Sequence, residues 1–264
     1  MPMLNRDGVK LFYDEAGRGG QPMVFVHGWT CDHTHFAPQF ERFGTDRRVV
    51  AVDLKGHGQS DKPQTGPESS YDISGFADDV AWMCHELDLE RPVIVGHSMG
   101  GIIALEVAAH HDIASAIVMV DAAPILAAPE VIASVNAFIS EMKGPSHEAA
   151  RRGFIEFLLF IDTDDPVLRA EIIEAMMAAP LHVAIACMEG LQRWDASAAV
   201  AACSVPALHI GAANPINDNA VLRGLNPLIQ GGQTVGAGHF NQLMVPDQVN
   251  PMIERFLKNV TLPA

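Results

Sequence analysis

The chain has few cysteines, few basic residues and no long uninterrupted apolar run. Its four cysteines are scattered over 264 residues, at Cys31, Cys84, Cys187 and Cys203. A zinc site or the disulfide framework of a small secreted domain needs closely spaced cysteine pairs. We therefore expect reduced, mostly buried thiols.

Positive charge is scarce, because 17 Lys and Arg stand against 32 Asp and Glu, a formal net charge of -15. Phosphate backbones and anionic membrane surfaces repel such a protein. We expect neither nucleic acid nor a membrane as a partner, and a small molecule as substrate. The sequence leaves open whether the chain is a monomer or a homo-oligomer.

No segment resembles a targeting sequence or a membrane span. The first ten residues mix acidic and basic side chains and contain no apolar run. The longest apolar stretch, residues 92–109, is interrupted by His97, Ser98 and Glu106, which a bilayer would tolerate only at high cost. We expect a cytoplasmic protein.

What the chain does contain is enough apolar material for a core. Hydrophobic residues make up 48% and charged residues 19%, which argues against disorder. Short runs rich in β-branched residues alternate with glycine-containing turns and helical patterns, and this alternation predicts an α/β protein with a mostly parallel sheet flanked by helices. The expected strands are residues 23–26, 48–52, 92–95, 116–120, 206–210 and 233–235, with residues 9–13 as an antiparallel edge.

Strand signals vanish between Pro124 and about Trp194, where apolar residues recur at helical spacing. Breaks at residues 144–145, 165–166 and 179–180 contain proline, which divides this segment into about four short helices. We expect residues 1–123 and 195–264 to form the core, and residues 124–194 a helical cap (lid) over it.

The strongest motif is Gly96-His97-Ser98-Met99-Gly100-Gly101, which follows the strand at 92–95 and opens a helical stretch. This pattern is typical of a nucleophile elbow, a strained turn that exposes a serine hydroxyl. Glycines flank the serine because side chains there would collide with the neighbouring strand and helix. Ser98 is the predicted nucleophile.

With this motif the chain resembles the α/β-hydrolase family over nearly its whole length, which implies an eight-stranded sheet with an inserted lid. His27-Gly28-Trp29 is similar to the family's oxyanion loop, with the backbone N–H of Trp29 as one donor. The N–H of Met99, at a helix N-terminus, would be the second. Gly236-Ala237-Gly238-His239 matches the loop of the catalytic histidine, so His239 is the expected base.

The triad acid departs from the commonest pattern of the family. The usual position is occupied by Asn214, which cannot supply the negative charge that stabilises an imidazolium. Asp121 follows the strand at 116–120, a site from which some family branches supply the acid, and it keeps the order serine, acid, histidine. We expect Asp121 as the triad acid and hold Asp218 in reserve.

Two further groups of polar residues have structural interpretations. Asp53 and His57 lie in a turn with two glycines that suits a tight bend better than a phosphate cradle. Asp32, His33 and His35 could suggest a metal, but the first two follow the oxyanion loop and no separate third ligand has convincing spacing. We expect no metal and no cofactor.

These features favour a carboxylic ester hydrolase or lactonase that acts through an acyl-enzyme on Ser98. A carbon–carbon bond hydrolase stays open. A second class is a cofactor-free ring-opening dioxygenase of N-heteroaromatic substrates, whose oxyanion segment resembles residues 27–33. A third is a ligand-binding module without turnover. Haloalkane dehalogenases and epoxide hydrolases carry a carboxylate at the elbow, where this chain has serine.

Overall fold

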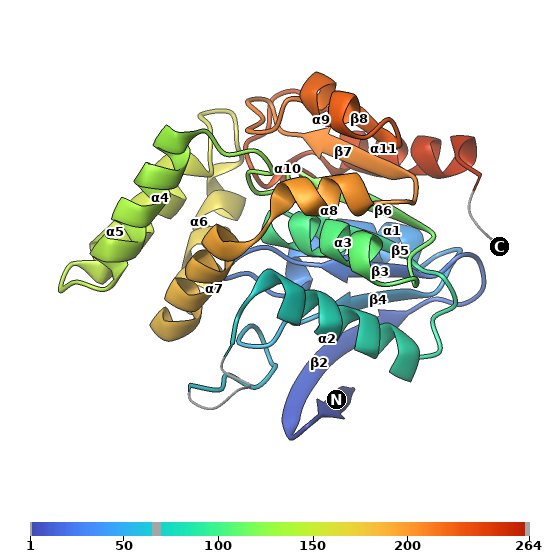
Figure 1. The fold of residues 1–264 in the computed structure, drawn as a ribbon, viewed down its shortest axis with the longest axis horizontal. Coiled ribbons are helices and arrows are strands. Elements are labelled where there is room, and N and C mark those ends of the chain that lie inside the picture. The colour runs from blue at the N-terminus through green and yellow to red at the C-terminus, as the bar shows by residue number, and fades with distance from the viewer. Residues whose placement is uncertain (1, 65–69, 262–264) are drawn as a thin grey trace.

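The computed structural model describes residues 2–64 and 70–261, and it contains the expected eight-stranded α/β sheet (Figure 1). Strands β3 to β8 run parallel, and β2 pairs in antiparallel fashion with both β1 and β4. In spatial order the strands are β1 (Met3–Arg6), β2 (Val9–Ala16), β4 (Val49–Val52), β3 (Met23–Val26), β5 (Val93–His97), β6 (Ala116–Val120), β7 (Ala207–Gly211) and β8 (Ile229–Gln233).

Both edges of the sheet differ from the sequence expectation. The segment predicted as the edge, residues 9–13, is part of β2 and is covered by β1. The strand predicted at 233–235 lies earlier, at Ile229–Gln233. The strand has no clear signal in the sequence because it contains glycines. A Cβ atom on Gly231 would lie 2.5 Å from the side chain of Asn219, so the packing of α9 (Asn219–Leu225) excludes β-branched residues at this position.

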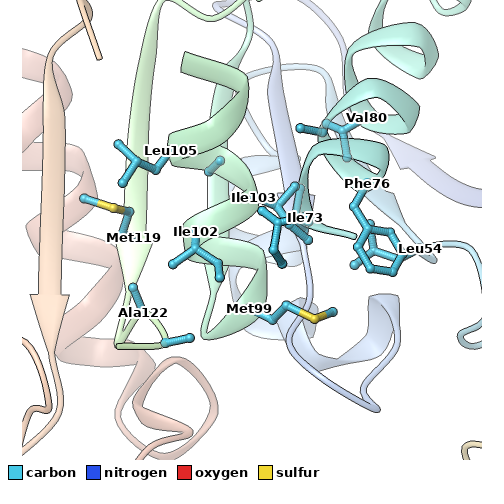
Figure 2. Packing of buried hydrophobic residues seen from close by; sticks show 14 of the residues in the cluster. Leu54, Ile73, Phe76, Val80, Met99, Ile102, Ile103, Leu105, Met119 and Ala122 are labelled. Carbon is cyan, nitrogen blue, oxygen red and sulfur yellow. The ribbon is translucent and has the colours of Figure 1, made fainter. Parts of the chain in front are cut away.

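Helices cover both faces of the sheet, and the strand residues alternate between two apolar clusters. Met23 and Phe25 pack with α1 (Ala37–Phe43) and α11 (Pro246–Asn259), whereas Val24 and Val26 pack on the opposite face. That face is covered by α2 (Ile73–Glu86), α3 (Met99–His110) and α8 (Ala196–Ala202). Figure 2 shows Ile73 of α2 beside Ile103 of α3 in this cluster. Short helices η1 (His33–Phe36) and α10 (Asn241–Met244) complete the core.

The helical insertion lies between β6 and β7. Its first four helices are α4 (Pro129–Met142), α5 (His147–Leu158), α6 (Pro166–Met177) and α7 (Leu181–Arg193). They gather at one end of the sheet, at the left of Figure 1. The predicted break at residues 144–145 separates α4 from α5, and α6 and α7 begin at the other two, but α5 ends at Leu158, well before the break at 165–166. We call α4 to α7 and their connections the cap.

The cysteines agree with the expectation of buried, reduced thiols. All four cysteines are buried and unpaired. Among residues 2–64 and 70–261, no single helix is long and apolar enough to cross a membrane, although α6 and α7 together, bent by 94°, satisfy the criteria of length and composition.

Candidate active site

Ser98 lies on the sharp turn between β5 and α3. Its backbone adopts φ 54 and ψ -118, a strained conformation for a residue with a side chain. A Cβ on Gly96 would lie 1.9 Å from the carbonyl oxygen of Gly100, and one on Gly100 would lie 2.0 Å from that of Val26. The two glycines therefore allow the close approach that exposes the half-buried Ser98 to a cavity.

Asp121 and His239 form a hydrogen-bonded pair beside this cavity. Nδ1 of His239 donates to Oδ2 of Asp121 over 2.7 Å, and Oδ1 of Asp121 accepts from the backbone N–H of Ala212 at 2.9 Å. Because a carboxylate can only accept, the proton of His239 lies on Nδ1 and Nε2 keeps a lone pair. Asp121 has φ 37, so two of the predicted site residues occupy the left-handed region.

Ser98 and His239 line the same cavity but form no hydrogen bond with each other within the described residues. Contacts between nucleophile and base often tighten only when substrate is bound. The arrangement thus offers a hydroxyl, an imidazole with a free lone pair and a buried carboxylate at the carboxyl ends of β5, β8 and β6.

The other two candidates for the acid lie elsewhere. Asp218 caps α9, where its carboxylate accepts from the backbone N–H groups of Ala220 at 2.7 Å and Val221 at 3.3 Å. Asn214 is exposed, although it does line the cavity. The structure brings Asp121, and neither of these two residues, into contact with His239.

Trp29 and Met99, the predicted oxyanion donors, both line the cavity. Neither backbone N–H has a hydrogen-bond acceptor within residues 2–64 and 70–261. A Cβ on Gly28 would lie 3.1 Å from that of Ser98, so the loop after β3 passes directly beside the elbow. The indole N–H of Trp29 donates to the carbonyl oxygen of Ala184 in α7, which ties this loop to the cap.

His97 is a neighbour of the site that the sequence did not single out. Its Nε2–H donates to the backbone oxygen of His239 at 2.9 Å, and the two rings lie 4.6 Å apart. Burial, and secondly the proximity of His239, keep the pKa of His97 well below its ordinary value. A neutral His97 supports the loop without placing a second positive charge beside the base.

The cavity has a volume of about 730 Å³ and lies between the sheet and the cap. Cap residues that line it are Glu130, Val131, Ser134, Val135, Phe138, Phe154, Phe157, Leu158, Leu159, Phe160, Ile161, Met176, Met188, Leu191 and Gln192. Met177, another apolar residue of α6, does not. Most of the lining residues are aliphatic or aromatic, and those that the structure describes include no Lys or Arg.

The polar residues with structural interpretations make local contacts. Asp32 caps η1 by accepting from the N–H of Thr34, and Nδ1 of His33 lies 2.9 Å from Oδ1 of Asp53. The other oxygen of Asp53 accepts from the N–H of Gln59, which closes the glycine turn. Within the described chain, no cluster of three His, Cys, Asp or Glu side chains could hold a metal.

Two supporting residues have no signal in the sequence. Asn217 joins the loop after β7 to the turn after Asp121, because its amide accepts from the N–H of Ile125 and donates to the carbonyl of Ala122, both at 2.8 Å. Asp164, between α5 and α6, accepts from the N–H of Gly238, beside His239. Both act over long sequence separations, which local patterns do not encode.

Comparison with known proteins places this geometry in a family. Two curated relatives are a superfamily protein of AB hydrolases, YisY, from Bacillus subtilis (strain 168), 40% identical over 105 residues, and a non-heme chloroperoxidase from Streptomyces lividans, 42% identical over 97 residues. The aligned segments cover 39% and 36% of this chain and 37% and 34% of those proteins. The chain thus matches little more than a third of their length.

Solved structures match over nearly the whole chain. Est816, described as an N-acyl homoserine lactone degrading enzyme, has a TM-score of 0.83 and 26% identity, covering 97% of this chain and 100% of its own. The enol-lactonase from Burkholderia xenovorans LB400 has a TM-score of 0.83 at 22% identity, covering 98% of this chain and 100% of its own, and shares the fold. The model of the Alpha/beta hydrolase family matches residues 23–251. The chain therefore belongs to the alpha/beta hydrolase family.

Proposed function

We propose that the protein is a serine hydrolase that cleaves a small, largely apolar ester or lactone through an acyl-enzyme on Ser98. The observation that carries the proposal is the 2.7 Å bond between Asp121 and His239, at a cavity that also contains the Ser98 hydroxyl. Nucleophile, base and orienting acid are the three roles that acyl transfer requires.

In the proposed reaction the Ser98 oxygen attacks the substrate carbonyl while Nε2 of His239 takes the hydroxyl proton. Asp121 holds the imidazole by Nδ1 and stabilises the positive charge that develops. The amide groups of Trp29 and Met99 donate to the oxyanion, and Nε2 returns the proton to the leaving alkoxide. Water then attacks the acyl-enzyme with the same proton transfers, which releases the acid and frees Ser98.

The cavity favours an uncharged substrate. Its lining is mainly aromatic and aliphatic, and its described acidic residues, Asp121 and Glu130, face no Lys or Arg. An anionic substrate would lose hydration without gaining a cationic partner. N-acyl homoserine lactones, named for the neighbour Est816, and neutral alkyl esters therefore suit the site better than esters that carry a carboxylate.

The segment that suggested a dioxygenase, residues 27–33, lies partly at this cavity, because Gly28, Trp29 and Cys31 line it. Asp32 caps η1, His33 lies against Asp53, and neither of these two residues lines the cavity. A carbon–carbon bond hydrolase would use the same three residues, so substrate tests separate it from an esterase. A binding module without turnover gives no reason for a strained serine beside a paired histidine.

The test is to incubate the protein with a fluorophosphonate probe, locate the adduct, and measure hydrolysis of a panel. The panel contains neutral nitrophenyl esters, N-acyl homoserine lactones and esters of similar size that carry a carboxylate. We expect an adduct on Ser98 and a kcat/KM at least about tenfold higher for the neutral compounds. Oxygen uptake with a hydroxyquinolone, without hydrolysis of any ester or lactone, would contradict the proposal.

A further inference from the structure

The loop between α5 and α6 lies against the loop that carries His239. We call residues 159–164 the anchor loop and residues 236–240 the histidine loop. The carbonyl oxygen of Leu159 accepts from the backbone N–H of His239 at 3.0 Å, and the hydroxyl of Thr163 donates to the carbonyl of Gly236 at 3.1 Å. A segment of the cap thus holds the backbone on which the base is mounted.

Asp164 makes the third and most buried of these contacts. Its Oδ1 accepts from the N–H of Gly238 at 2.8 Å, and its Oδ2 accepts from the N–H of Ile161 at 2.8 Å. The residue is 7% exposed, and within the described chain it has no cationic partner. Both oxygens of this buried carboxylate accept hydrogen bonds from backbone amides. These bonds join the anchor loop to the histidine loop, and because they are charge-assisted they are stronger than neutral ones.

The contact is also tight. A Cβ on Gly238 would lie 2.6 Å from Oδ2 of Asp164, shorter than real Cβ contacts, and 3.0 Å from the carbonyl oxygen of Leu159, at their lower limit. The glycine before His239 therefore permits the two loops to approach. This requirement is separate from that at Gly236, which has φ 76 and open space around its Cβ position.

We propose that Asp164 is a positioning residue, through which the cap sets the place of His239 relative to Ser98. The inference rests on the proposed function, because it assigns His239 the role of base. According to this proposal, the anchor loop helps to position the base, while other parts of the cap line the cavity. A displacement of the anchor loop would remove three hydrogen bonds from the histidine loop and misplace the imidazole.

The test compares Asp164→Asn with Asp165→Asn. Asparagine keeps the shape of Asp164 but turns an NH2 group toward one of the two amides, which loses an acceptor. Asp165 is the adjacent acid, exposed, and accepts from the N–H groups of Val167 and Leu168 at the start of α6. We expect kcat to fall about tenfold or more in the first variant, and to stay within about twofold of wild type in the second.

Esters of different chain length separate a role of Asp164 in positioning His239 from a role in shaping the cavity wall. If Asp164 positions His239, an acetate ester too short to reach the cap loses kcat as much as a long-chain ester does. If Asp164 only shapes the cap, the loss appears in KM and is confined to long chains. That second result, with the variant folded by circular dichroism, would overturn the proposal.

Hydrogen–deuterium exchange of residues 236–240 gives a readout that needs no activity. We expect faster exchange in Asp164→Asn and in Gly238→Ala, and unchanged exchange in Asp165→Asn and in Gly224→Ala, which has open space around its Cβ position. Suppose that the wild-type protein hydrolyses no ester or lactone and the fluorophosphonate labels no residue, while this exchange pattern appears. Then the proposed function is wrong, and the role of Asp164 in holding the histidine loop is supported. If hydrolysis is normal and both exchange and kcat are unchanged in Asp164→Asn and Gly238→Ala, the anchor is wrong. Gly238→Ala decides the matter if Asp164→Asn does not fold.

Discussion

The carboxylate of Asp121 accepts a 2.7 Å hydrogen bond from His239, although 118 residues separate the two in the chain. The two segments can meet because β6, β7 and β8 are parallel neighbours in this order, so that Asp121, after β6, and the loop after β8 lie at the same edge of the sheet. The other oxygen of Asp121 is held by the N–H of Ala212 at the end of β7. Two independent contacts thus fix the carboxylate.

Asp121→Asn is expected to keep the fold and to lower turnover about a thousandfold or more. The asparagine amide favours the wrong tautomer of His239 and supplies no charge for the imidazolium. Steady-state turnover of one ester, with circular dichroism to verify folding, is the measurement.

Asp218→Asn is the matched control for this prediction. Asp218 caps α9 and has no contact with His239, so the loss is expected in stability, about 1 kcal/mol or less, with turnover near wild type. If turnover fell strongly in Asp218→Asn and stayed near wild type in Asp121→Asn, the triad acid would belong to the loop after β7 instead.

The elbow and most of the sheet could be predicted because their signals are local. Strands buried on both faces, such as β5 and β6, consist of β-branched and aliphatic residues, and the turn at Ser98 needs the glycines that mark it. Asp121 was predicted from its place at the end of a strand, after Asn214 had been recognised as a poor acid; its hydrogen bond with His239 agrees with that prediction, and its role as the acid stays a prediction.

The remaining features depend on contacts between distant segments. Asp164 reads as one of several acids before a proline, and only its bond with Gly238 distinguishes it. Asn217 and His97 are likewise defined by partners far along the chain. The strand β8 was misplaced because it contains two glycines, which are depleted in strands, and packing against Asn219 requires one of them, Gly231.

Ser98→Ala is expected to fold normally and to lose nearly all hydrolysis, because it removes only a hydroxyl from the elbow. Loss of a triad member typically costs several orders of magnitude in turnover. Turnover of the best ester and labelling by a fluorophosphonate are both measured. Turnover equal to wild type would show that another residue is the nucleophile.

The cap is expected to govern acyl-chain preference. Phe138 and Phe154 stack with ring centroids 4.2 Å apart, both rings pack against Trp29, and all three line the cavity with Phe157 and Met176. Replacing Phe138, Phe154, Phe157 or Met176 by alanine should shift the preferred chain length, since one methylene is worth roughly 1–3 kcal/mol in an apolar pocket.

Met177→Ala is the control for this scan, because Met177 is in the same helix as Met176 and does not line the cavity. Relative kcat/KM values for a series of nitrophenyl esters give the preference. An unchanged series in all four cavity variants, or a shift in Met177→Ala as large as in Met176→Ala, would refute a role of these side chains in chain-length selection.

The buried His57 makes stability depend on pH. Burial, and secondly the neighbouring His27, lower the pKa of His57 to about 3 in the folded state, against about 6.5 for a solvated imidazole. Below pH 6.5 the unfolded chain therefore binds a proton that the folded chain excludes, so the free energy of unfolding falls as the pH drops toward 3. One such group contributes a slope of up to about 1.4 kcal/mol per pH unit.

In His57→Gln the unfolded chain no longer binds this additional proton, since glutamine does not titrate. The variant is expected to lose stability near pH 8, because it gives up the bond from Nδ1 to the carbonyl of Lys55, and to show a shallower decline between pH 6 and pH 4. Urea unfolding followed by circular dichroism at several pH values measures both effects. His85→Gln, at an exposed position of α2, should keep the wild-type slope. A His57→Gln slope equal to that of wild type would mean that other groups, among them His27 and His97, whose pKa values burial also lowers, carry the whole acid sensitivity.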